Sequence, residues 1–173
     1  MAVNTWDGAS DTNWNDAANW NTTGVTDRVP TNADDVIIAN VSNDPVIPDG
    51  LNPEVKTIEL AASATLTCGN NTITVNNETS QYAFKGIGTL IPQTSTIEVT
   101  TDADTLIKCE NGSFNNLTIN PDGGDDTITL YSAITVGGTL TITGGTLDTN
   151  SSSNYALTVT GQCFVTGTLT GNA

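Results

Sequence analysis

Carboxylates are the side chains best able to do chemistry in this chain, which has 19 aspartates and glutamates but no histidine. Without histidine, a Ser-His-Asp or Cys-His site cannot form, and zinc loses its commonest nitrogen ligand. Two carboxylates could still act as acid and base in polysaccharide cleavage. The candidate pairs are Asp102 with Asp104, and Asp34 with Asp35. Basic residues that could assist them are few and widely spaced, so we predict that the protein is not an enzyme. They are Arg28, Lys56, Lys85 and Lys108.

A loop rich in aspartate and glycine, NPDGGDD at residues 120–126, could wrap oxygen ligands around a calcium ion. Its candidate ligands are Asp122, Asp125 and Asp126. The loop lacks the spacing and the distal glutamate of an EF-hand, and turns require the same residue types. We therefore expect a solvated turn, with Ca²⁺ as the alternative, and we predict no other cofactor.

The three cysteines are far apart and odd in number, which excludes a complete disulfide framework and a CxxC metal site. In an alternating strand, Cys68 shares a face with Leu66, and Cys163 shares a face with Val165. We therefore predict that Cys68, Cys109 and Cys163 are buried core thiols.

The net charge of −15 would repel a nucleic-acid backbone or an anionic membrane surface, so neither is an expected partner. No apolar run approaches the length of a membrane span. The start, MAVNTWDGAS, lacks the basic and apolar regions of a secretory signal peptide, which predicts synthesis and release in the cytoplasm. A chain of 173 residues suits one domain or one elongated module.

These side chains must be positioned by β-strands. From residue 55 onward, short runs such as TITV (72–75), TIEV (96–99) and NLTI (116–119) alternate apolar and polar residues between glycine, asparagine and aspartate. Period-two alternation rich in Thr, Val and Ile is the signature of a strand, and no window has a helical stripe. The sequence predicts an all-β protein.

Similar strands separated by glycine-rich corners favour a right-handed β-solenoid, in which each coil buries its inward side chains against the coils above and below. Leu117, Leu140 and Leu157 lie about one coil apart, although their spacings of 23 and 17 residues indicate insertions. An antiparallel β-sandwich or jelly roll needs the same short strands and remains the alternative.

Residues 1–54 differ from the repeat region 55–173, because they hold all three tryptophans, Trp6, Trp14 and Trp20, in a polar segment. The first coil of a solenoid has an unpaired edge and needs a cap. Tryptophans can supply one, each burying a large area while its N–H finds a carbonyl. We therefore predict a capping and anchoring segment, with contact to a partner or stacking on a sugar as alternatives.

The same segment resembles one found ahead of β-helical repeats in bacterial surface proteins and in uncharacterised proteins of tailed phages. The resemblance covers about the first quarter of the chain. Its motifs are Trp6 with Gly8, then Trp14, the pair Asn19-Trp20, the pair Val29-Pro30 and the run DDVII at residues 34–38.

The resemblance implies a β-helical protein on the exterior of a particle or cell, and the start and short length favour the phage relatives. We expect a non-enzymatic virion protein, a decoration or auxiliary protein on the capsid exterior. Its partners would be the major capsid protein and its own copies, as a homotrimer. The alternatives are a carbohydrate-binding tail fibre or surface adhesin that uses the tryptophans as sugar platforms, and a polysaccharide-degrading β-helix enzyme.

Overall fold

Alternation of apolar and polar residues places every second side chain of each short strand inside the molecule. In a computed structural model, which describes residues 2–79, 81–122 and 124–171, 45% of the chain is strand and 2% is helix. The strands wind into a β-solenoid of about six turns, which confirms the predicted fold over the sandwich. No helix of the described ranges is long and apolar enough to cross a membrane.

The described strands form three sheets, which we call the long sheet, the six-stranded sheet and the short sheet. The long sheet contains β1 (Val3–Trp6), β2 (Trp20–Thr22), β3 (Asp35–Ile38), β5 (Thr57–Leu60), β6 (Thr65–Thr67), β8 (Tyr82–Ile91), β10 (Thr105–Gly112), β12 (Thr127–Leu130), β15 (Thr146–Asp148) and β18 (Thr168–Thr170). The six-stranded sheet contains β4 (Glu54–Val55), β7 (Thr72–Val75), β9 (Thr96–Val99), β11 (Asn116–Ile119), β14 (Leu140–Ile142) and β17 (Cys163–Val165). The short sheet contains β13 (Ile134–Val136) and β16 (Leu157–Val159).

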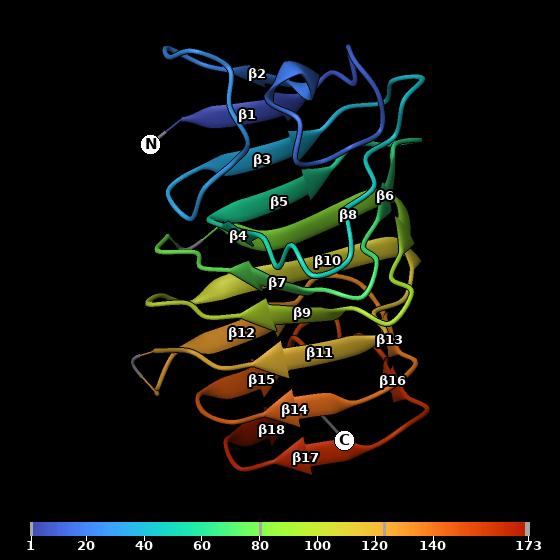
Figure 1. The fold of residues 1–173 in the computed structure, drawn as a ribbon. Coiled ribbons are helices and arrows are strands. Elements are labelled where there is room, and N and C mark those ends of the chain that lie inside the picture. Colours follow the sequence, from blue (N-terminus) through green and yellow to red (C-terminus); the bar gives the residue numbers. More distant parts are fainter. Residues whose placement is uncertain (1, 80, 123, 172–173) are drawn as a thin grey trace.

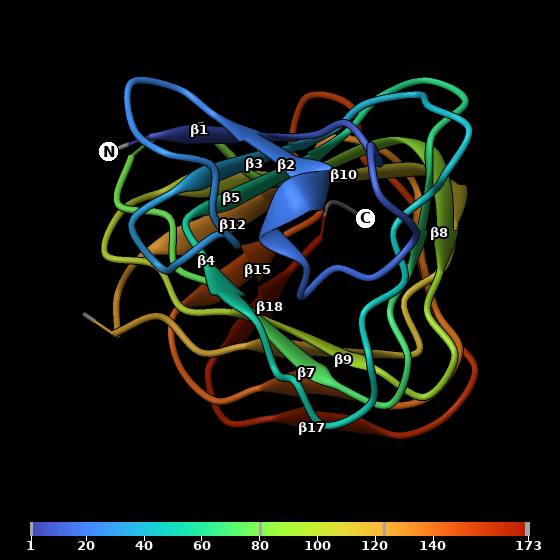
Figure 2. The same cartoon turned by 45° about the horizontal axis from the view of Figure 1, so that its top comes forward.

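The winding is right-handed, as predicted. In Figure 1 the strands of the six-stranded sheet run to the left in front, and the first strands of the long sheet run to the right behind them. The chain descends as it circles, and the view onto the upper end in Figure 2 places the two sheets on opposite sides of the interior. Apart from the antiparallel pair of β1 and β2, neighbouring strands pair in parallel, as expected when each coil stacks on the next.

The core is a set of ladders in which one apolar side chain of each coil lies on the next. In the six-stranded sheet, Ile73 pairs with Ile97, Ile97 with Leu117, and Leu117 with Leu140. All four are at most 1% exposed. This packing between coils removes apolar side chains from water and stabilises the solenoid.

One predicted contact between coils, that of Leu157 with Leu140, is wrong. Leu117 and Leu140 pair, but the next rung on Leu140 is Cys163, because Leu157 lies in β16 of the short sheet and pairs with Ile134. Each of the last coils has a third side, so a residue 17 positions after Leu140 has not yet completed the circuit.

The longest strand, β8, turns a corner of the solenoid. Its first half pairs with β5 and its second half with β6. Between them, a Cβ atom built on Gly88 would lie 2.3 Å from the carbonyl oxygens of Ala61 and Ala64. Glycine is required here because the backbones of successive coils approach too closely for a side chain.

No break separates residues 1–54 from residues 55–173. The predicted boundary falls inside β4, which pairs with β7, and β3 pairs in parallel with β5 across it. The N-terminal segment therefore forms the first coil of the same solenoid.

Candidate functional sites

The three tryptophans close the N-terminal end of the solenoid. Trp6 and Trp20 are directly opposite in the antiparallel pair β1–β2, and Trp14 packs against Trp20. The ring centroids of Trp6 and Trp20 are 5.0 Å apart, and those of Trp14 and Trp20 are 4.7 Å apart, both edge to face. Figure 2 shows β2 and the short 3₁₀ helix Ala17–Asn19 lying over this end.

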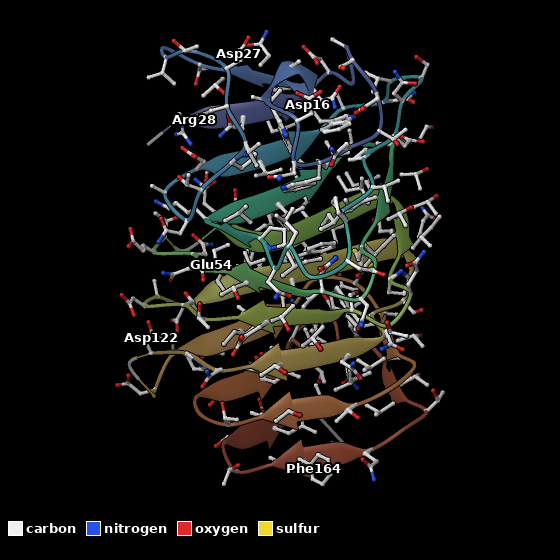
Figure 3. The ribbon with its side chains drawn as sticks, viewed as in Figure 1. Asp16, Asp27, Arg28, Glu54, Asp122 and Phe164 are labelled. Carbon is white, nitrogen blue, oxygen red and sulfur yellow. The ribbon has the colours of Figure 1, made fainter. Side chains whose placement is uncertain are left out.

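Polar groups hold this cap together. The Nε1–H of Trp6 donates to the carbonyl of Asn43 at 2.7 Å, and that of Trp20 donates to the carbonyl of Trp14 at 2.8 Å. The fully buried side chain of Asn19 accepts the main-chain N–H groups of Ser10 and Asp11. Asp16, labelled in Figure 3, caps the 3₁₀ helix by accepting the N–H of Ala18.

The indoles of Trp6, Trp14 and Trp20 are at most 1% exposed. A ring that is enclosed on both faces cannot stack on a sugar or contact a partner. The arrangement supports the cap over contact to a partner or stacking on a sugar through these indoles.

Asp34 and Asp35 do not form a pair of acids. Asp34 is 1% exposed and forms a bidentate ion pair with Arg28, whose guanidinium nitrogens lie 2.5 and 2.7 Å from its oxygens. Burial alone would raise the pKa of Asp34, but hydrogen bonds from Arg28 and Thr31 outweigh it and lower the pKa to about 2. Asp35 instead accepts the hydroxyl of Thr57 on the adjacent strand. Asp34 is therefore a structural anion that is poorly suited to exchange protons.

In the second candidate pair, Asp102 and Asp104, one acid bonds to the main chain. Asp104 accepts the main-chain N–H of Thr127 at 2.8 Å, which joins two consecutive coils. Burial raises the pKa of Asp126, and the negative charges of Asp125, Asp104 and Asp102 raise it further. These acids repel one another at an exposed turn.

Calcium at Asp122, Asp125 and Asp126 is the alternative to a solvated turn in this loop. Within the described ranges, which omit Gly123 of this loop, no three acidic or cysteine side chains are grouped to hold a metal ion. Asp122 lies at the left edge of the solenoid in Figure 3, on the turn before β12.

The cysteine prediction is confirmed for Cys68 and Cys109 and wrong for Cys163. Burial raises the pKa of the Cys68 thiol to about 12 and that of the Cys109 thiol to about 11. Cys163 faces inward like its neighbour Leu140, but β17 is the last strand of its sheet, so its side chain is exposed. The alternation in sequence gives the facing of a residue but not its exposure.

The structure also assembles a surface that the sequence analysis missed. All three tyrosines of the chain, Tyr82, Tyr131 and Tyr155, form a row of ring contacts with centroids 5.7 and 6.3 Å apart. Lys85 and Lys108 lie beside them on neighbouring strands β8 and β10, directly opposite each other. We call these five residues the tyrosine–lysine surface.

A hollow of about 360 Å³ adjoins this surface on the outer side of β1, β3, β5 and β8. Its lining includes Tyr82 and Lys85, together with Asp35, Lys56 and Glu59. This grouping could not be predicted from the sequence, because Tyr82 and Tyr155 are separated by 73 residues and about three coils.

The fold and the cap define a right-handed β-solenoid protein closed at its N-terminal end. The chain belongs to the DUF8693 family, described as a domain of unknown function, whose match covers residues 5–91. That range runs from the first tryptophan strand to the end of β8, which agrees with the cap and the first coils forming one unit. No match was found among curated proteins or among solved structures.

Proposed function

We propose that this chain is a non-enzymatic structural protein on the exterior of a tailed-phage virion, a decoration protein of the capsid. The observation that carries the proposal is the asymmetry of the two ends. The first coil is sealed by buried tryptophans, whereas the last coil exposes apolar side chains. Such a rod would be attached at one end and present its acidic sides to solvent.

The surface of the last coil suits attachment. Phe164, Val165 and Leu169 are 54, 47 and 42% exposed, and Phe164 lies on β17 at the lower end in Figure 3. Residues 149–171 contain no charged side chain, although the net charge of the chain is −15. Exposed apolar groups without charge favour burial against another protein surface. In this proposal the partners are the major capsid protein and further copies, as a homotrimer.

The acidic sides suit a crowded particle surface. Like charges on neighbouring copies repel each other and keep densely packed proteins from aggregating. The stacked coils supply their own stability through buried ladders and main-chain hydrogen bonds, so the rod needs no cofactor in this role.

The alternatives have less support. A polysaccharide-degrading enzyme would need two acids free to act together, but Asp34 is held in its ion pair with Arg28 and Asp104 accepts the main-chain N–H of Thr127. A fibre or adhesin that binds sugar through its tryptophans would need accessible indoles, and these are buried.

Quantitative mass spectrometry of density-purified particles from the source culture tests the proposal. We expect a copy number comparable with that of the major capsid protein. A few copies per particle would place the chain on the tail and contradict the decoration role, and complete absence from particles would overturn the virion proposal.

Rebinding to particles stripped of the protein tests the attaching end. We expect Val165→Asp to abolish rebinding, because it places a charge in the apolar contact. Val25→Asp is the matched control. Val25 lies in the N-terminal region and is 56% exposed, so this substitution adds the same charge away from the last coil. Equal rebinding of both variants would contradict attachment through the last coil.

A further inference from the structure

The tyrosine–lysine surface is chemically unlike the rest of this acidic protein. It holds every tyrosine of the chain and two of its four basic residues, and a third, Lys56, lines the adjoining hollow. These residues come from different coils, so only the stacking of the long sheet brings them together.

The tyrosines offer rings that a ligand can reach. Tyr131 is 45% exposed, and its ring is perpendicular to that of Tyr82 and tilted by 43° from that of Tyr155. Aromatic rings of this kind combine a flat apolar face with a polar hydroxyl at the edge. Burial and the neighbouring Tyr131 raise the pKa of Tyr82. A tyrosine hydroxyl is protonated at neutral pH and can donate a hydrogen bond.

The lysines are already paired with acids. The Nζ of Lys85 lies 2.7 Å from Glu59, and the Nζ of Lys108 lies 2.8 Å from Glu110. Each pair is partly exposed and presents donors and acceptors side by side with little net charge. This chemistry suits a ligand rich in hydroxyl groups and gives no preference for a polyanion.

The site is elongated. The hollow reaches β1 and β3 at one end, and Tyr131 follows β12 at the other. From β3 to β12 the long sheet spans four strand spacings, about 19 Å at the usual distance between strands. A single sugar ring would fill only a part of this length.

We propose that the tyrosine–lysine surface and its hollow bind a stretch of a neutral polysaccharide along the solenoid axis. Sugar rings would lie on Tyr131 and its neighbours, and hydroxyl groups would bond to the paired side chains of Lys85, Glu59 and Lys108. Apolar faces combined with a few placed polar groups are the general pattern of ligand sites. This inference does not depend on a virion location.

Native gel electrophoresis through gels that contain dextran, mannan, galactan or alginate tests the inference with the whole chain. We expect at least one neutral polysaccharide to slow the wild-type protein. Tyr131→Ala should raise the apparent dissociation constant obtained from that retardation roughly tenfold, equivalent to about 1.4 kcal/mol. Tyr131→Phe, which keeps the ring, should retain most of it.

The matched control is Phe164→Ala, which removes an exposed ring from the six-stranded sheet, remote from the proposed site. It should bind like the wild type, and circular dichroism should show that both alanine variants are folded. The inference is overturned if no neutral polysaccharide slows the protein, if only alginate does, or if Tyr131→Ala and Phe164→Ala are retarded equally.

Discussion

The Nε1–H of Trp20 donates to the main-chain carbonyl of Trp14 at 2.8 Å, and the two rings meet edge to face with centroids 4.7 Å apart. One residue thus supplies both a ring contact and a hydrogen bond to the cap. Because Trp20 also packs on Trp6, it contacts both of the other tryptophans of the cap.

Replacing Trp20 should therefore destabilise the whole solenoid. We expect Trp20→Ala to lower the free energy of unfolding by about 3–5 kcal/mol, because it removes a large buried ring. Trp20→Phe should lie between this variant and the wild type, since it keeps a ring but loses the N–H donor. Urea unfolding followed by circular dichroism measures these differences. Phe164→Ala is the control at an exposed ring, and an equal cost for it and Trp20→Ala would contradict the cap.

The ion pair of Asp34 and Arg28 predicts a loss of stability in acid. The pKa of Asp34 is about 2 in the folded protein and has its ordinary value near 3.8 in the unfolded chain. The unfolded chain therefore takes up the proton first, so the contribution is complete above about pH 5 and is lost as the pH falls towards 2. The shift corresponds to about 2.5 kcal/mol.

We expect Asp34→Asn to be less stable at pH 7 and to lose stability less steeply between pH 5 and 2 than the wild type. Unfolding curves recorded across this range provide the comparison. Asp122→Asn removes a carboxylate from an exposed turn and serves as the control. If the free energy of unfolding of Asp34→Asn depends on pH as steeply as that of the wild type, the ionisation of Asp34 does not stabilise the folded state.

The cysteines should differ in reactivity. Cys163 is exposed, whereas Cys68 and Cys109 are buried and have raised thiol pKa values, so few thiolates form there. A maleimide should add once to the folded protein and at all three thiols in denaturant, as read by intact mass. Cys163→Ser should abolish labelling of the folded protein. Rapid labelling of Cys68 in the native state would contradict the enclosed core.

Two adjacent glycines at a corner should respond differently to alanine. A Cβ atom on Gly138 would lie 2.6 Å from the Asn116 side chain and 2.8 Å from the Asn115 carbonyl oxygen, whereas one on Gly137 would meet only the Phe114 carbonyl at 3.8 Å. We expect Gly138→Ala to cost about 1–3 kcal/mol through overpacking.

Gly137→Ala should change the stability by less than about 0.5 kcal/mol, because a substitution that meets no close neighbour has little effect. Thermal unfolding of the two variants side by side measures the difference. Equal midpoints for Gly137→Ala and Gly138→Ala would show that coils do not approach closely at this corner.

Strand positions could be predicted where alternation is clean, and less well where it is interrupted. The run TIEV matches β9 (Thr96–Val99), and DDVIIAN contains β3. The longest strand, β8, was not among the predicted runs, because Gly86 and Gly88 interrupt its pattern. Gly88 is needed where the strand turns a corner, which is a contact between coils and has no local signal.

The sequence by itself determined the all-β class and the inward face of each strand, because alternation is a local property. For the tryptophans it left a cap, a partner contact and a sugar platform open. Only the tertiary structure decided which strands stack. Coil lengths vary, so it placed Leu157 on a third side, left Cys163 exposed and brought Tyr82 beside Tyr131. Neighbours on a solenoid face are separated by a full circuit of the chain. The loops and corners between strands determine the number of residues in each circuit. Their lengths follow no repeat that can be read along the sequence.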